Sequence, residues 1–191
     1  MKKGKLSQIR RGFEVFRQIC INCHSFELFK LNDLNFIGFT TKQTSVLIKG
    51  YKINNYFNLP YKSLNQAKHF NNGVVPPDLS LITKYKSIEW VYEVLTGYIR
   101  NHLQSHNNFF YNKRFEFGIT AMRPPLTNGC IKHNFNVPLT VHQYSRDISE
   151  FLHWVSEPWI NSRKKLILPV LSFFIFMHTL LLTNLNKYTI K

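Results

Sequence analysis

Cys20-Ile21-Asn22-Cys23-His24 is the stretch from which both the fold and the function of this chain can be argued. It matches the Cys-x-x-Cys-His pattern at which a c-type haem is attached. Each thiol can form a thioether with a haem vinyl group, and the adjacent imidazole can then bind the iron from one side. The pattern therefore predicts one covalent haem c, attached at Cys20 and Cys23, with His24 as an iron ligand.

Half of a zinc site is the first alternative for this cysteine pair. The chain has only 3 Cys, and zinc needs two further ligands, which Cys130 and one of the histidines could supply. The matching function is a zinc-stabilised basic module that binds nucleic acid. An absorption spectrum separates the two possibilities, because haem c gives Soret and α bands and zinc gives none. If the pair carries haem, we expect Cys130 to be a small buried residue.

The charge of the chain limits its partners. Its formal net charge is +15, from 25 Lys and Arg against 10 Asp and Glu. Such a balance favours anionic partners, which include lipid head groups, nucleic acid and acidic proteins. The basic residues are scattered, and no segment alternates them with aromatic residues as a single-strand binder would. We therefore expect no nucleic-acid partner.

Residues 166–186, LILPVLSFFIFMHTLLLTNLN, contain no Asp, Glu, Lys or Arg. At about 1.5 Å per residue a helix of this length spans roughly 30 Å, one hydrocarbon core. Basic residues flank the run on both sides, and Pro169 would lie in the first turn, where its missing N–H is harmless. A buried helix of a soluble protein is the alternative, but it would need a larger domain to cover it. The run predicts a membrane anchor that brings the chain to a lipid bilayer.

The chain is expected to have two parts. Residues 1–162 would form the haem domain, and residues 163–191 the transmembrane anchor with a short tail. The chain begins MKKGKLSQIRRG, and no apolar run follows before Cys20, so we expect no cleavable signal peptide. Residues 25–70 are predicted to be loop with short helices, and residues 99–140 to be mostly loop.

Three amphipathic helices are predicted in the haem domain. The first covers residues 8–20. Ser87 can cap a second helix that Gly97 ends, and Thr140 can cap a third that Glu157-Pro158 ends. The side chains expected to face inward are Ile9, Phe13, Phe16 and Cys20, then Ile88, Val91, Val94 and Leu95, then Tyr144, Ile148, Phe151, Leu152 and Val155.

Met122 is the best candidate for the second axial ligand of a haem iron. It lies in residues 118–125, GITAMRPP, where prolines hold the chain extended and can present a thioether without movement. Met1 is terminal, and Met177 lies in the predicted membrane span. Ligation by His and Met raises the reduction potential and leaves no open position for oxygen, which suits an electron carrier. The alternative is a methionine that merely fills the core.

Five segments of residues 7–170 are more specific than the haem motif alone. They are SQIRRGFEVFRQICINCHS, AKHFNNGVVPPDLSLIT, EWVYEVLTGY, FFYN…AMRPPL and ISEFLHWVSEPWINSRKK. In this order they resemble the cytochrome c1 family, the haem subunits of the ubiquinol–cytochrome c reductase complex. The resemblance implies a mainly α, cytochrome-c-like haem domain with one C-terminal transmembrane helix.

The resemblance also implies roles for particular residues. It makes Cys20 and Cys23 the thioether sites and His24 and Met122 the axial ligands, and it places Asn71 and Pro77 beside the haem. Three departures from the family are visible: a shorter region between His24 and Asn71, a Trp at position 90 in place of a Tyr, and few acidic residues. In addition, Lys86 stands where the family typically has an Arg near a haem propionate. Lysine can pair with a carboxylate but lacks the two-pronged guanidinium.

By resemblance, the haem would accept electrons from a Rieske iron–sulfur protein and pass them to soluble cytochrome c. Cytochrome b would be a further neighbour in a dimeric complex of the mitochondrial inner membrane. The haem domain would face the intermembrane space, or the periplasm if the chain is bacterial. We expect a carrier subunit without a catalytic acid or base. The nearest alternative is another membrane-anchored c-type cytochrome that feeds a terminal oxidase, but it would not share the NNGxxPPDLS and LTGY segments.

Overall fold

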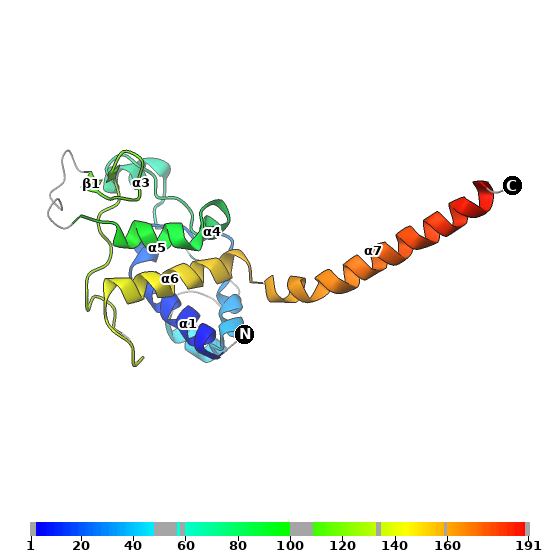
Figure 1. Cartoon of the computed structure of the whole chain (residues 1–191). Coiled ribbons are helices and arrows are strands. Elements are labelled where there is room, and N and C mark those ends of the chain that lie inside the picture. The colour runs from blue at the N-terminus through cyan, green and yellow to red at the C-terminus, as the bar shows by residue number, and fades with distance from the viewer. Residues whose placement is uncertain are drawn as a thin grey trace. The chain divides into compact units, whose positions relative to one another are not determined.

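The computed structural model describes residues 3–47, 57, 60–99, 109–132, 135–158 and 160–189 (Figure 1). Two compact units are present, Met1–Ser156 and Glu157–Lys191. The elements are α1 (Lys3–Gln18), η1 (Cys20–Asn22), η2 (Leu31–Ile37), α2 (Thr41–Leu47), α3 (Leu64–Phe70), α4 (Ile82–Tyr85), α5 (Ile88–Thr96), β1 (Phe110–Tyr111), β2 (Ile119–Thr120), α6 (Val141–Ser156) and α7 (Ile160–Thr189). The predicted mainly helical class is confirmed. The irregular structure expected at 48–56, 58–59, 100–108 and 133–134 lies outside the described residues.

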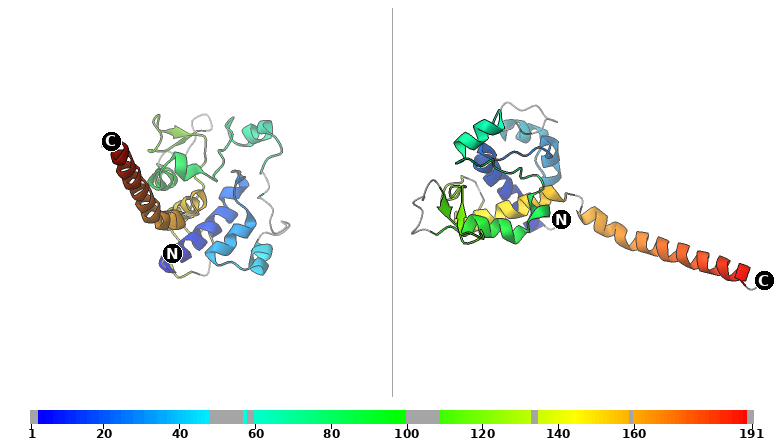
Figure 2. Two further views of the ribbon diagram at one scale, coloured as in Figure 1. Left: turned by 90° about the vertical axis from the view of Figure 1, so that its right-hand side faces the viewer. Right: turned by 90° about the horizontal axis from the view of Figure 1, so that it is seen from above.

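The core of the first unit is the crossing of α1 and α6, on which α5 also packs (Figure 2). Gly12 makes this crossing possible, because a Cβ there would collide with the Asp147 carbonyl oxygen and lie 2.6 Å from Phe151 Cβ. Next to it, the Arg11 guanidinium donates from Nε and Nη2 to the two Asp147 carboxylate oxygens, each at 2.8 Å. Such a two-pronged pair is both strong and specific in its geometry. The two helices are therefore locked together at one level.

Aromatic side chains fill the space around this crossing. Phe16 lies between α6 and the chain that follows the Cys-x-x-Cys-His motif, with its ring centroid 4.2 Å from that of Phe26 and 5.7 Å from that of Phe151. Aromatic pairs at such distances stabilise a core beyond the area that they bury. The cluster includes Phe13, Phe16, Phe26, Phe29, Phe39, Phe57, Phe151 and Trp154. It fixes the segment after the motif against the two main helices.

The predicted helix caps are confirmed. Ser87 Oγ accepts from the Trp90 N–H at 3.0 Å, and Thr140 Oγ1 accepts from the Gln143 N–H at 3.2 Å. The side chains predicted to face inward from α6 are all buried. Gly97 is the C-cap of α5, as expected. The first helix is longer at its start than predicted, since α1 begins at Lys3, where the polar residues gave no apolar periodicity.

A small antiparallel hairpin lies in the stretch predicted to be irregular. β1 pairs with β2, with Phe110 opposite Thr120 and Tyr111 opposite Ile119. Gly118 has a φ of 67°, the left-handed conformation that glycine adopts without strain. The strands were not predicted because two-residue strands carry no alternation long enough to recognise. This hairpin leads directly to Met122.

The second unit is dominated by α7. Within the described residues, Arg163–Leu185 is the one helix segment long and apolar enough to cross a membrane. Its apolar side chains are exposed, including Phe174 and Ile175. The expectation that Pro169 lies in the first turn is wrong, because the polar residues before the apolar run are helical too and Pro169 is inside α7. The domain boundary expected between residues 162 and 163 stays a prediction.

Candidate haem-attachment site

The Cys-x-x-Cys-His motif forms a tight turn at the end of α1. The Cys23 and His24 main-chain N–H groups both donate to the Cys20 carbonyl, at 3.2 and 3.0 Å. Asn22 Nδ2 donates to the Gln18 and Ile19 carbonyls at 3.1 and 3.2 Å, which satisfies the end of the helix. Cys20 is half-buried and Cys23 exposed, and both thiols are free. The turn therefore keeps both thiols available for thioether formation.

The environment of Cys20 and His24 keeps both side chains uncharged. Burial, helped by the nearby Cys23, raises the pKa of the Cys20 thiol to about 12. Burial also lowers the pKa of His24, against the opposing effects of Pro77 and Asp78. Because burial penalises the charged form, His24 is a neutral imidazole at neutral pH. A neutral imidazole is the form that binds metals.

Pro77 fixes the ring of His24 across 53 residues of chain. The distance from His24 Nδ1 to the Pro77 carbonyl oxygen is 2.8 Å. A carbonyl only accepts, so Nδ1 carries the proton and Nε2 keeps its lone pair. A metal-binding histidine almost always donates its other ring N–H to a carbonyl or carboxylate in this way. The Nε2 lone pair of His24 is therefore left available for a metal.

Asp78, which the sequence analysis did not single out, holds the Pro77 segment in place. Its carboxylate accepts from the Glu27 N–H at 3.0 Å and from the Ser80 N–H at 2.8 Å. Burial alone would raise the pKa of Asp78, but these hydrogen bonds outweigh it and hold that pKa below its ordinary value. The Leu79 N–H also donates to the Ser25 carbonyl at 3.1 Å. These hydrogen bonds join the residues that follow His24 to the residues that follow Pro77.

Met122 is half-buried just after the hairpin, and side chains hold its main chain. The Met122 N–H donates to Thr120 Oγ1 at 3.2 Å, and the Met122 carbonyl accepts from the Tyr98 hydroxyl at 2.9 Å. Asn72 Nδ2 donates to the carbonyl of the preceding residue, Ala121, at 3.1 Å. Tyr98 was not predicted as a site residue, although it ends the LTGY segment. Burial raises its pKa, so its hydroxyl remains a donor.

The loop of residues 71–77 joins the two candidate ligand segments. Pro77 contacts His24, and Asn72 contacts the chain before Met122. Asn72 and Gly73 both have left-handed φ angles, 54° and 83°, which confirms the turn expected from this sequence. The structure thus brings one loop against His24 and against the residue before Met122.

Asn71 and Lys86 are placed less directly. Asn71 Nδ2 donates to the Tyr61 hydroxyl at 2.8 Å and to the Ala67 carbonyl at 2.7 Å, so it closes the end of α3. Lys86 is exposed between α4 and α5, with Nζ 5.5 Å from the centre of the Trp90 ring. No hydrogen bond between the described residues brings Lys86 to the other candidate residues. Their roles beside a haem remain predictions.

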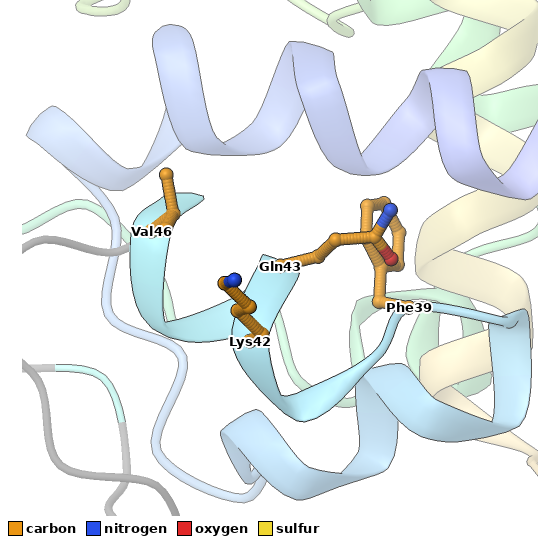
Figure 3. Close-up of a pocket in the computed structure, with 4 residues that line it drawn as sticks. All are labelled: Phe39, Lys42, Gln43 and Val46. Atoms are coloured by element: carbon orange, nitrogen blue, oxygen red, sulfur yellow. The ribbon is translucent and has the colours of Figure 1, made fainter.

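A hollow of about 390 Å³ elsewhere on the unit is separate from these residues. Figure 3 shows Phe39, Lys42, Gln43 and Val46 around it, on α2 and the chain just before that helix. None of the candidate haem residues lines it. It is therefore not the attachment site.

The donor set tests which cofactor fits. Two free thiols on one turn, an imidazole with its lone pair on Nε2 and a thioether in a held loop match a covalent haem. In the part of the chain that the structure describes, no three His, Cys, Asp or Glu side chains gather as metal ligands would. The zinc alternative, which relied on Cys130 and a histidine, finds no such group there.

Comparison with known families agrees with this donor set. The model of the Cytochrome C1 family matches residues 2–190.

The chain belongs to the Cytochrome C1 family.

Similar proteins come from mitochondria and bacteria. "Cytochrome c1, heme protein" of Euglena gracilis is 33% identical over 181 residues, covering 83% of this chain and 74% of that protein. "Cytochrome b-c1 complex catalytic subunit, mitochondrial" of Candida albicans is 31% identical over 183 residues, 83% of this chain and 63% of its own length. "Cytochrome c1" of Blastochloris viridis is 28% identical over 221 residues, 93% of this chain and 78% of that protein. The chain thus covers less than two thirds of the length of some of these relatives, such as the Candida albicans protein.

Proposed function

We propose that this chain is the haem-bearing electron carrier of a quinol–cytochrome c reductase complex. Its haem c would be attached through Cys20 and Cys23, with His24 and Met122 as axial ligands. Membership of the Cytochrome C1 family supports this, as does the printed name of the Candida albicans relative, a subunit of the cytochrome b-c1 complex. The bound haem supplies one-electron redox chemistry; the protein supplies binding, orientation and electrostatics.

The hydrogen bond between His24 Nδ1 and the Pro77 carbonyl is the observation that carries the proposal. It directs Nε2 as a ligand and fixes the orientation of the ring before any cofactor is attached. A thioether from Met122 would complete a His/Met pair, which favours a high potential and leaves no position for oxygen. The chain therefore has the features of a carrier rather than of an oxygen-binding protein.

The partners follow from the same family. Electrons would come from a Rieske iron–sulfur protein and go to soluble cytochrome c, with cytochrome b as a neighbour in a dimeric complex. The apolar segment Arg163–Leu185 would anchor the chain in the bilayer. The name of the Candida albicans relative includes "mitochondrial", which favours a mitochondrial membrane. A haem domain in the intermembrane space is part of the proposal and rests on the family resemblance alone.

Spectroscopy of the purified full-length protein tests the proposal. We expect Soret and α bands, a haemochrome spectrum of the c type in alkaline pyridine, and haem that stays with the protein in acidified acetone. A double variant, Cys20→Ala with Cys23→Ala, should release its haem into the solvent. Protein that purifies with its folded helices but never acquires covalent haem in a cell with c-type maturation would overturn the proposal.

A further inference from the structure

Tyr98 connects the Met122 segment to the helical body of the first unit. Its hydroxyl donates to the Met122 main-chain carbonyl at 2.9 Å, across 24 residues of sequence. Tyr98 follows the C-cap of α5, and α5 packs on α6. A hydrogen bond to a main-chain carbonyl also restrains the Cα of that residue, from which its side chain extends. The direction of the Met122 thioether therefore depends on where Tyr98 is held.

Asn112 holds the chain opposite Tyr98. The two residues form an antiparallel bridge, and Asn112 is fully buried. Its Nδ2 donates to the Val94 carbonyl of α5 at 2.7 Å, and its main-chain N–H donates to the Gly118 carbonyl at 2.8 Å. A buried amide satisfied in this way specifies one arrangement, because a shift would leave polar groups without partners. Asn112 therefore ties the hairpin to the end of α5.

Gly97 shows how closely these two elements approach. A Cβ at position 97 would lie 2.7 Å from Asn112 Oδ1 and 2.6 Å from the Glu93 carbonyl oxygen. Both distances are shorter than any normal carbon–oxygen contact, so only glycine allows this packing. The residue next to Tyr98 is thus fixed by close contact as well as by hydrogen bonds.

Two further hydrogen bonds near Met122, made by Thr120 and Asn72, restrain it less. Thr120 Oγ1, which accepts from the Met122 N–H, belongs to the same hairpin and would move with the methionine. Asn72 bonds to Ala121 rather than to Met122, and that bond is exposed to solvent. A hydrogen bond open to water contributes less than one that is partly buried. Among the described residues, Tyr98 is the donor outside the hairpin that bonds Met122 itself.

We propose that Tyr98 is a positioning residue for the axial ligand Met122. The inference rests on the proposed function, in which Met122 binds the haem iron, and it adds the group that keeps the thioether in place. Loss of the phenol hydroxyl would free the Met122 carbonyl and raise the fraction of molecules in which the sulfur has left the iron. One neutral hydrogen bond changes such an equilibrium by up to about tenfold.

The test uses the full-length protein with its haem and compares Tyr98→Phe with Tyr92→Phe. Tyr92 lies on α5 and its hydroxyl bonds to His142 Nδ1 at 2.9 Å, so it controls for the loss of a phenol elsewhere. The readouts are the midpoint potential, the weak red absorption band of sulfur–iron ligation, and carbon monoxide binding. Tyr98→Phe should lower the potential, weaken the band and raise carbon monoxide binding by up to about tenfold. Tyr92→Phe should change none of them.

Two further variants keep the inference separate from the proposed function. Met122→Leu should abolish the band; if it does not, the ligand assignment fails and this inference with it. Thr120→Val removes the hydroxyl that belongs to the same hairpin, and it should change the band less than Tyr98→Phe does. A Tyr98→Phe protein identical to the unmodified one, while Met122→Leu loses the band, overturns the inference alone. A larger effect of Thr120→Val would also overturn it, because the hairpin would then position the methionine.

Discussion

The two segments that present the candidate ligands are held in different ways. In the first segment the ring of His24 itself is fixed, since His24 Nδ1 donates to the Pro77 carbonyl at 2.8 Å. In the second segment, Tyr98 and Thr120 bond to the main chain of Met122 and not to its thioether. The first ligand is therefore oriented by its own ring, whereas the second is oriented only as well as its backbone. Substitution of neighbouring side chains should therefore change the orientation of Met122 more readily than that of His24.

The supports beneath the two sides also differ. His24 follows α1, a long helix that packs across α6 through Gly12 and is locked there by the pair of Arg11 and Asp147. Met122 follows a hairpin of two-residue strands. A short two-stranded hairpin has little stability of its own, so it depends on the contacts that tie it to the helices. We therefore expect the position of His24 to depend on helix packing and the position of Met122 to depend on a few hydrogen bonds.

The largest effect is expected from removing the second ligand. Met122→Leu should keep the covalent haem but lower the reduction potential on the order of hundreds of millivolts, within the range that axial ligands set. It should also open a position for carbon monoxide. Redox titration and difference spectra measure both. An unchanged potential together with no carbon monoxide binding would remove Met122 from the ligand role and end the comparison.

A second prediction tests the helix packing beneath His24. Gly12→Ala places a Cβ against the Asp147 carbonyl and should lower the free energy of unfolding by about 3 kcal/mol, because backbone must shift. Gly4→Ala is the matched control in the same helix, with nothing within 4 Å of its Cβ, and should be neutral or slightly stabilising. Denaturant unfolding followed by circular dichroism gives both values. Equal stabilities would show that the two helices do not cross at Gly12.

A third prediction concerns Asp78, whose pKa is lower in the folded chain than its ordinary value. A carboxyl of this kind stabilises the fold above its unfolded pKa, and the contribution disappears as pH falls through the folded pKa. Asp78→Asn should therefore cost about 1 kcal/mol near pH 7, allowing for its partial exposure, and progressively less in acid. Unfolding titrations at several pH values would show this.

The exposed Glu116 supplies the control for that series. Glu116→Gln should change stability by less than about 0.5 kcal/mol at every pH. A penalty for Asp78→Asn that stays constant into acid, or one that matches Glu116→Gln, would mean that the Asp78 carboxylate does not hold the Pro77 segment.

Much of the helical framework could be predicted because its signals are local. Ser87 and Thr140 precede apolar periodicity, and both act as caps. The apolar spacing in α6 identified its buried face. Pro169 was misplaced because hydropathy marks where a chain is apolar and not where a helix begins. The hairpin was missed because its strands are too short to show a period.

The site residues also differ in whether a local sequence pattern reveals them. The motif identifies Cys20, Cys23 and His24 from adjacent residues. The bonds that orient the ligands join residues 53 and 24 positions apart, His24 with Pro77 and Met122 with Tyr98. No local pattern encodes such pairs, because a carbonyl acceptor carries no information about its donor. Pro77 entered as a site residue only through the family resemblance, and Tyr98 entered only as the end of the LTGY segment, without a role.

Two segments at the candidate ligands carry more basic than acidic residues. Residues 60–77, with α3 and the loop that contacts His24, contain two lysines and no acid, and residues 109–125, with Met122, contain three basic residues and one acid. Arg114 is paired with Glu93 at 2.7 Å. The exposed charges of the two segments are Lys62, Lys68, Lys113, Arg114, Arg123 and Glu116. A basic electron acceptor that approaches these two segments would therefore meet repulsion, unless Asp78 and Glu27 near His24, or acidic groups of another subunit, offset it.

The smallest predicted effect is the salt dependence of electron transfer to a basic cytochrome c. Attraction between opposite charges gives a rate that falls steeply with ionic strength, whereas repulsion gives one that is flat or rises. We expect the second behaviour for the full-length protein in detergent. Lys68→Glu combined with Arg123→Glu should raise the rate several-fold at low salt and restore a downward slope. Lys132→Glu, an exposed change outside both segments, should have a smaller effect. If the unmodified protein already shows a steep fall, its few local acids steer the acceptor despite the net charge of +15.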